Sequence, residues 1–343
     1  MFHLTVGSQI YIVAPPYTAS GGPELLHQLC AILNQKGFHA FMFYREKLKK
    51  SQIYEKPVPE RFLHYNTPFI AEIEDSKENL LIVPETITRP LIEYKNIQKC
   101  EWWLAANNYF WIMEINSHKY LTFAYHCLQF LLGKPTPLSF NTIKKQNVIH
   151  IAQCWYIVSH LRSKGLHNVA YLSDYLGEEH FEHSGGQHSL FAADMREDII
   201  LYNPNRNTKY VKHIKEAFPD FEFIAIENMT PQQVIALMKK AKIYADFGAH
   251  PGKDRLPREA AMCGCCILTS TLGSADFYDD VPISHEFKFE RKRKNIKHIA
   301  EKIKYIFENY EGEREKFNQY RDFIRNEKKQ FEKDVDKIFK LDP

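Results

Sequence analysis

Two hydrophobic spacings alternate along the start of the chain. Residues 9–14 read Gln-Ile-Tyr-Ile-Val-Ala, a short β-branched run that stops at Pro15 and predicts a buried strand. From Gly21 to Gly37 the leucines and isoleucines recur at the helical period of about 3.6 residues, and Pro23 suits a first helical turn. A second strand-like run occupies residues 39–44. This order predicts a β-α-β unit.

The same alternation continues to about residue 172 and restarts after a polar, glycine-containing stretch at residues 177–194. In the first half we expect further strands at residues 80–83, 101–105, 148–151 and 168–172. In the second half we expect strands at 199–202, 221–226, 243–247 and 266–269, with helices at 210–218, at 231–240 and from Arg258 onward. A charge-rich helical pattern begins near residue 294. Such alternation is typical of parallel, doubly wound sheets, so the predicted fold class is α/β.

A length of 343 residues also suits about two domains. We predict two Rossmann-like domains, at residues 1–190 and 191–290, that face each other across a cleft, with C-terminal helices at 291–343 packing across both. Open parallel sheets bind ligands outside the carboxyl ends of their strands. The loops after Ala14, Tyr202 and Phe247 are therefore expected at the cleft.

The composition is that of an ordinary globular protein, with 44% hydrophobic and 25% charged residues, which excludes disorder and fibrous repeats. Lysine and arginine (45) nearly balance aspartate and glutamate (42), which leaves a formal charge of +3. So weak an overall field does not indicate nucleic-acid binding. Any anion site must therefore be local.

The seven cysteines are an odd set, which argues against a disulfide framework and a zinc knuckle and favours a reducing cytoplasm. The first residues do not read as a signal peptide, and the longest apolar stretch, at residues 120–133, falls short of the roughly 20 residues that cross a bilayer. We expect a cytoplasmic protein without a membrane span.

The strongest candidate chemistry lies at residues 250–264. Lys253, Arg255 and Arg258 place three cations in six residues at a predicted helix N-terminus, where unpaired backbone N–H groups also favour an anion. This pattern predicts a diphosphate site, and Glu259, one or two residues inside the helix, could accept hydrogen bonds from ribose hydroxyls. A solvated charged loop, with Glu259 stabilising the helix dipole, is the alternative.

Two further loops carry suitable residues. After the strand at 199–202, a turn at Asn203 leads to Arg206 and Lys209, which lie three residues apart at a helix start and could reach an anion. Gly21 and Gly22 follow the first strand and allow a ligand to approach the backbone closely. The G-x-G-x-x-G pattern of dinucleotide dehydrogenases is not matched. Each loop could also be only a turn with solvated charges.

These motifs, in this order, resemble those of the GT-B glycosyltransferases. Residues 257–270, Pro-Arg-Glu-Ala-Ala-Met-Cys-Gly-Cys-Cys-Ile-Leu-Thr-Ser, resemble the nucleotide-sugar motif of the retaining E-x7-E group, usually Glu-Ala-Met-Ala-Cys-Gly-x-Pro-Val-Val-Ala. The resemblance implies that Glu259 binds the nucleotide ribose, that Arg206 and Lys209 hold the donor diphosphate, and that no metal or other cofactor is needed. The first glutamate is missing, because Pro251 stands eight residues before Glu259. Divergent bacterial sugar transferases that act on surface polysaccharides also show a His-Pro loop here.

The resemblance and the charge pattern together give one predicted set of donor-binding residues. It comprises Gly21, Gly22, Asn203, Arg206, Lys209, His250, Gly252, Lys253, Asp254, Arg255, Arg258 and Glu259. Transfer also needs a base to deprotonate the acceptor hydroxyl. Glu24, His27 and Asp174 lie on loops expected at the cleft and are the candidates, although a single acid or histidine is more often structural.

Three other features favour structural explanations. His180, His183 and His188 lie among glycines and match no metal-binding helix, so no metal site is predicted. Cys263, Cys265 and Cys266, and the pair Trp102 and Trp103, suit packing in the interior. The basic run at 291–294 could touch anionic lipid headgroups or could begin a solvated helix.

We therefore predict a metal-independent glycosyltransferase that moves a sugar from a nucleoside-diphosphate donor to a glycan or lipid-linked glycan acceptor, in assembling bacterial capsule or lipopolysaccharide. No nucleic-acid partner is expected, and peripheral contact with the inner face of the membrane stays open. The alternatives are a GT-B sugar-nucleotide epimerase and a glycan- or nucleotide-binding protein without catalysis.

Overall fold

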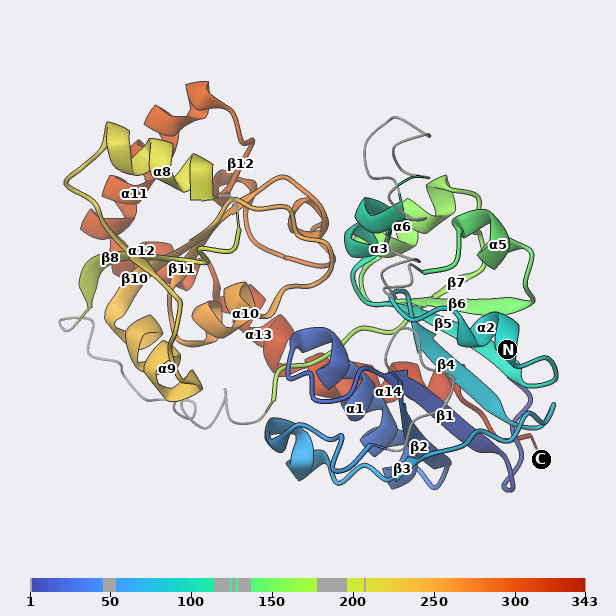
Figure 1. The fold of residues 1–343 in the computed structure, drawn as a ribbon. Coiled ribbons are helices and arrows are strands. Elements are labelled where there is room, and N and C mark those ends of the chain that lie inside the picture. Colours follow the sequence, from blue (N-terminus) through green and yellow to red (C-terminus); the bar gives the residue numbers. More distant parts are fainter. Residues whose placement is uncertain are drawn as a thin grey trace. The chain divides into compact units, whose positions relative to one another are not determined.

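The computed structural model describes residues 2–45, 54–113, 124, 128, 137–177, 196–206 and 208–342. The chain divides into two compact units (Figure 1). Unit 1 comprises Met1–Asp174 and Lys329–Pro343, and unit 2 comprises Tyr175–Lys328. The division expected near residue 190 falls among residues 178–195, outside the described part of the chain, as does the histidine cluster at 180–188.

Unit 1 is built on a parallel seven-stranded sheet in the order β3-β2-β1-β4-β5-β6-β7. Its strands are β1 (Gln9–Ala14), β2 (His39–Tyr44), β3 (Phe69–Ile70), β4 (Leu80–Pro84), β5 (Gln98–Trp103), β6 (Val148–Ala152) and β7 (Val169–Tyr171). Its helices include α1 (Gly21–Gln35), α2 (Pro90–Glu93), α3 (Ala106–Met113), α5 (Phe140–Lys144) and α6 (Trp155–Ser163). The strand order reverses next to β1, as in doubly wound sheets.

The central strand β1 explains why its sequence is an unbroken apolar run. β2 and β4 flank it, and Ile10, Ile12 and Val13 are fully buried. A parallel strand covered on both faces has no solvent side, so hydrophobic residues do not need to alternate with polar ones. Helix α1 packs on β1 and β2 and buries Leu25, Leu26 and Leu29.

Unit 2 is built on a parallel five-stranded sheet in the order β12-β11-β10-β8-β9. Its strands are β8 (Glu197–Tyr202), β9 (Glu222–Ala225), β10 (Ala241–Asp246), β11 (Cys266–Ser270) and β12 (Lys288–Phe289). Its helices include α8 (Thr208–Ala217), α9 (Pro231–Lys240), α10 (Arg255–Met262), α11 (Ile296–Glu308), α12 (Tyr310–Glu315) and α13 (Asn318–Arg325). A further helix, α14 (Glu327–Ile338), begins in unit 2 and continues in unit 1.

The predicted fold class is confirmed, because both sheets are parallel and carry helices between their strands. Two boundaries differ from the expectation by three residues. β5 begins at Gln98, three residues before the predicted start, and α10 begins at Arg255 with Asp254 at its N-cap position, instead of at Arg258. Glu259 is therefore the fifth residue of α10, one full turn from its start. The two-residue strands β3 and β12 are too short to carry a periodic signal.

The cysteines between α10 and β11 lie inside the protein, as expected. Cys263 is 3% exposed, and Cys265 and Cys266 are fully buried. Burial raises the pKa of Cys263 to about 12 and that of Cys265 to about 11, which leaves unreactive thiols. Trp102 and Trp103 are also fully buried, which confirms their packing role.

Among the helices within the described ranges, none combines the length and the apolar character that a bilayer crossing requires.

Candidate functional site

The candidate site lies where two neighbouring strands of unit 2 end. β8 and β10 are paired in parallel, with Tyr202 opposite Ala245, so the loops that follow them leave the same edge of the sheet. The first loop is a tight turn, in which the Asn203 side chain accepts a hydrogen bond from the Asn205 amide (2.9 Å). The second loop runs from residue 247 to the start of α10 at Arg255. This edge is where open parallel sheets bind their ligands.

A bidentate ion pair joins the two loops. Both terminal nitrogens of Arg206 donate to the Asp254 carboxylate, Nη1 to Oδ2 (2.5 Å) and Nη2 to Oδ1 (2.7 Å). Nη1 also donates to the backbone oxygen of Ala249 (2.9 Å). Burial opposes the charge on Arg206, but Asp254 and Asp246 outweigh burial and raise the pKa of its guanidinium. Arg206 is thus a fixed cation at the sheet edge, with a quarter of its side chain exposed.

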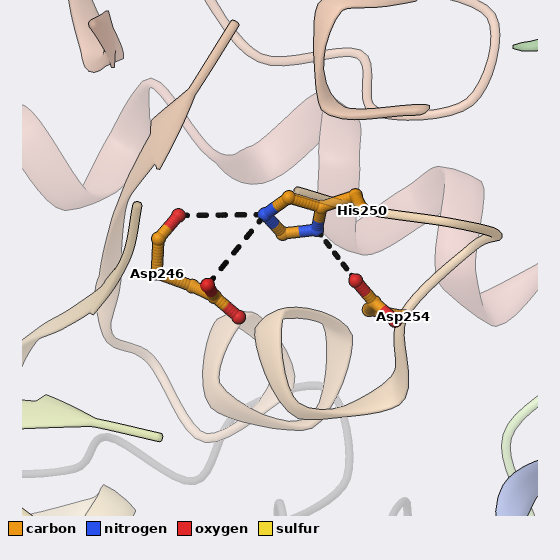
Figure 2. Close-up of side chains that lie close together, drawn as sticks. All are labelled: Asp246, His250 and Asp254. Carbon is orange, nitrogen blue, oxygen red and sulfur yellow. Dashed lines mark hydrogen bonds and ion pairs between the residues drawn. The ribbon is translucent and has the colours of Figure 1, made fainter. Parts of the chain in front are cut away.

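His250 stands between two carboxylates (Figure 2). Its Nδ1 lies 2.7 Å from Asp254 Oδ2, and its Nε2 lies 3.4 Å from the Asp246 backbone oxygen and 3.8 Å from Asp246 Oδ1. Thr269 Oγ1 lies 3.2 Å from the same Nε2. Burial alone would lower the pKa of His250, but Asp254 and Asp246 outweigh it and raise this pKa. The raised pKa favours an imidazolium that donates from both nitrogens.

The pKa values of Asp246 and Asp254 are shifted in opposite directions. Burial raises the pKa of Asp246. The positive charges of His250 and Arg206 lower this pKa but offset the effect of burial only in part. For Asp254, burial also works against ionisation, but His250 and Arg206 prevail and hold its pKa below the ordinary value. Asp254 is therefore the firmly ionised member of this group.

The backbone of His250 is fixed by the loop after β11. Its amide donates to the Leu272 oxygen (3.2 Å), and its own oxygen accepts from the Ser274 amide (3.0 Å). Gly273, between these partners, has a φ of 72°, and a side-chain carbon there would lie 2.0 Å from the His250 oxygen. Glycine is therefore required at position 273. In the same loop, the Ser274 hydroxyl donates to the Gly252 oxygen (2.6 Å).

Asp246, His250 and Asp254 also place three potential metal-ligand atoms within 4.8 Å of one another. The surrounding charges argue against a cation there. The Arg206 guanidinium already donates to both oxygens of the Asp254 carboxylate, so a metal ion there would compete with this ion pair. The contacts fit an ion-pair network better than a metal centre, and metal independence stays a prediction.

The three cations predicted to share one anion site have separate environments. Lys253 Nζ lies 3.0 Å from Glu327 Oε1, and Arg258 Nη1 donates to Glu327 Oε2 (2.7 Å), with all three side chains at most 2% exposed. Arg255 instead lies beside Glu259, with Nε 3.4 Å from Oε1. Lys253 and Arg258 therefore neutralise Glu327 in the interior, and this geometry does not group them with Arg206.

Lys209 is exposed in the first turn of α8. It lines a hollow of about 450 Å³ together with Tyr202, Val211, Lys212, Lys215 and Glu216. The structure thus places Lys209 near the end of β8. Its contact with a diphosphate stays a prediction.

The predicted bases of unit 1 are all buried. Glu24 accepts a hydrogen bond from the Tyr65 hydroxyl (3.0 Å). His27 contacts the Pro23 oxygen through Nδ1 (2.7 Å) and the Tyr44 hydroxyl through Nε2 (2.8 Å), and burial lowers the pKa of its ring. Asp174, shortly after β7, is 1% exposed. Both ring nitrogens of His27 are committed within unit 1, so this geometry does not favour it as a base.

The glycines of the first loop are where the sequence predicts them. Gly21 and Gly22 begin α1, and a side-chain carbon at position 22 would lie 3.6 Å from Leu104, an ordinary contact. The structure therefore shows a helix start here without a steric need for glycine at position 22.

Among the buried acids that the sequence prediction did not name are Asp246, Glu85 and Glu327. Asp246 ends β10, and a polar residue after the apolar run 243–245 was an available signal. Glu85 likewise follows the apolar strand β4, accepts hydrogen bonds from the amides of Leu104 (3.0 Å) and Ala105 (3.2 Å), and has its pKa raised to about 7 by burial. Glu327 lies in a charge-rich stretch, where nothing distinguishes it from its neighbours.

A search against protein-family models finds no match for this chain, and neither does a search of curated proteins. Solved structures do match. HepE of Anabaena, in complex with UDP and glucose, aligns with a TM-score of 0.60 at 8% identity, over 96% of this chain and 100% of HepE. Sucrose-phosphate synthase from Thermosynechococcus elongatus aligns with a TM-score of 0.54 at 13% identity, over 97% and 95%. A glycosyltransferase from Rickettsia africae gives 0.55 at 12%, over 96% and 99%.

This chain has the fold of the GT-B glycosyltransferases. The likeness covers nearly the whole length of each chain, so it includes both units and the C-terminal helices. The low identities limit it to the fold.

The buried Glu327 gives a stability prediction. In Glu327→Ala, Lys253 and Arg258 lose their buried counter-charge, so we expect the free energy of unfolding to fall by about 3–5 kcal/mol. Urea denaturation followed by circular dichroism measures this change. Asp322→Asn, which breaks the exposed ion pair with Arg325, is the matched control and should change little. Equal stability of Glu327→Ala and the control would contradict a buried ion-pair network.

The raised pKa of His250 gives a pH prediction. Its protonated form is favoured in the folded state, so its contribution to stability is complete below the ordinary pKa of 6.5 and is lost as pH rises through the folded value. We expect the stability difference between wild type and His250→Asn to shrink from about pH 6 to about pH 9. Thermal melting of both proteins across this range tests it, and a difference that grows with pH would refute a raised pKa.

Proposed function

We propose that the protein is a glycosyltransferase that takes a sugar from a nucleoside-diphosphate donor, with the donor diphosphate bound at the carboxyl edge of the unit 2 sheet. The observation that carries the proposal is Arg206, a cation fixed by Asp254 at the edge where parallel sheets bind ligands. The GT-B fold supports it, and HepE of this fold has been solved with UDP-glucose.

In the proposed reaction, Arg206 neutralises charge as the nucleoside diphosphate leaves, with Lys209 as a second cation from the next helix. A fixed cation stabilises the leaving group most because it needs no reorganisation as charge develops. Glu259 would accept hydrogen bonds from the ribose, and Arg255 beside it would help to orient its carboxylate. Of the candidate bases, Glu24 and Asp174 stay the proposed ones, and His27 is less favoured because both of its ring nitrogens already have partners. Metal independence belongs to the proposal.

The acceptor side is less constrained by this geometry. We propose a glycan or lipid-linked glycan acceptor of bacterial surface polysaccharide, and a protein that works in the cytoplasm. The resemblance to the E-x7-E group supports this only in part, because Pro251 replaces the first glutamate. The exposed cations at residues 291–294 would suit a peripheral contact with anionic lipid headgroups.

Titration calorimetry with UDP, GDP, dTDP and CMP tests the donor site. We expect one nucleoside diphosphate to bind. Arg206→Ala should weaken its affinity about 10- to 100-fold, since hydrogen bonds to charged groups contribute about 1.5–3 kcal/mol. Glu259→Ala should weaken the diphosphate and its nucleoside alike, because it acts at the ribose. Failure of all four nucleotides to bind would remove the proposed function.

Product analysis with the matching sugar nucleotide separates the remaining alternatives. Transfer requires an acceptor and releases the nucleoside diphosphate with a new glycosidic bond. An epimerase would change the sugar nucleotide without an acceptor. A donor that binds and stays intact across an acceptor panel would favour the non-catalytic alternative, which the missing glutamate at position 251 keeps open.

A further inference from the structure

Arg206 has five N–H groups, and its contacts with the described residues leave one side of its guanidinium open. Asp254 takes one N–H from each terminal nitrogen, and the Ala249 oxygen takes the second N–H of Nη1. Among the described residues, no contact uses Nε–H or the second N–H of Nη2. These two point the same way from the planar group, and such a parallel pair matches two oxygens of a phosphate.

We propose that Asp254 and His250 are positioning residues, which hold Arg206 so that its Nε and Nη2 face the donor diphosphate. This inference rests on the proposed function and assigns the two residues a role different from direct donor contact. Asp254 accepts hydrogen bonds from Nη1 and Nη2 at the end of the guanidinium, so the side that carries Nε–H and the second N–H of Nη2 stays available to a ligand.

His250 in turn fixes the orientation of the Asp254 carboxylate. Oδ2 of Asp254 accepts from Arg206 Nη1 and from His250 Nδ1, at 2.5 and 2.7 Å, and Oδ1 accepts from Arg206 Nη2. The His250 ring is 3% exposed and meets Thr269 on its other side, while its backbone is bonded to the loop after β11. A carboxylate held by two donors on separate loops cannot rotate without losing one of them.

His250 lies within a small group of opposite charges. Arg206 and the imidazolium form of His250, which its raised pKa favours, face the carboxyl groups of Asp246 and Asp254. Removing the Asp254 charge makes the group more positive, which by Coulomb attraction alone would strengthen binding of an anionic diphosphate. A positioning role instead predicts that loss of the Asp254 charge weakens diphosphate binding, so the two explanations can be distinguished by measuring affinity.

The experiment measures the affinity of Asp254→Asn for UDP, GDP and dTDP by calorimetry, with the corresponding nucleosides as references. We expect the diphosphate that binds wild type to bind at least about tenfold more weakly, while its nucleoside is unaffected. Asp198→Asn, which removes a paired carboxylate at the opposite end of β8, should leave both affinities unchanged. Diphosphate binding that is equal or tighter in Asp254→Asn would overturn the positioning role.

Two variants at position 250 keep the inference testable if Asp254→Asn does not fold. Asparagine can place an N–H near the position of Nδ1, whereas alanine cannot. We expect His250→Asn to retain diphosphate affinity within about threefold of wild type and His250→Ala to lose about tenfold. Equal affinities of the two variants would refute the role of this N–H. A wild type that binds none of the diphosphates would instead defeat the proposed function itself.

Discussion

The Asp254 carboxylate is the point at which the unit 2 site is held together. It accepts hydrogen bonds from Arg206, which follows β8, and from His250, which follows β10, so one anion joins the loops of two neighbouring strands. A carboxylate with so little solvent keeps its charge only if partners replace the lost hydration. Two cations supply this, and as a result each loop depends on the other for its conformation.

A second buried anion, Glu327, helps to hold the loop that carries Asp254. Arg258 pairs with Glu327 and also donates to the backbone oxygens of Asp254 (3.1 Å) and Lys253 (3.0 Å). The same arginine therefore links the interior ion pair to the loop that carries Asp254. The basic character of residues 253–258 serves two purposes, because Lys253 and Arg258 fix the loop and Arg255 stays near the surface beside Glu259.

Much of the fold could be predicted from sequence because central parallel strands such as β1 and β10 are continuous apolar runs with clear ends. Loop positions follow from the strands, so the sequence places Arg206 on the loop after β8 and Asp254 on the loop after β10, as the structure has them. Their mutual pairing was not predictable, since they lie 48 residues apart and the sequence offers each several partners. Glu327, 69 residues from Arg258, sits among many similar charges, and only folding selects it.

The start of α10 shows the same limit at short range. Cations at 253, 255 and 258 suggest one anion site, but α10 begins only at Arg255, so Lys253 precedes the helix and its side-chain direction does not follow the helical period. Lys253 and Arg258 are buried against Glu327, whereas Arg255 lies beside Glu259. Sequence spacing identified the charged loop, while the direction of each side chain depends on packing against α14, which is distant in the sequence.

A crystal structure with the bound nucleoside diphosphate tests the central claim most directly. We predict phosphate oxygens within hydrogen-bond distance of Arg206 Nε and Nη2, with the contacts among Arg206, Asp254 and His250 unchanged. A diphosphate bound elsewhere, or one that displaces Asp254 from Arg206, would contradict it.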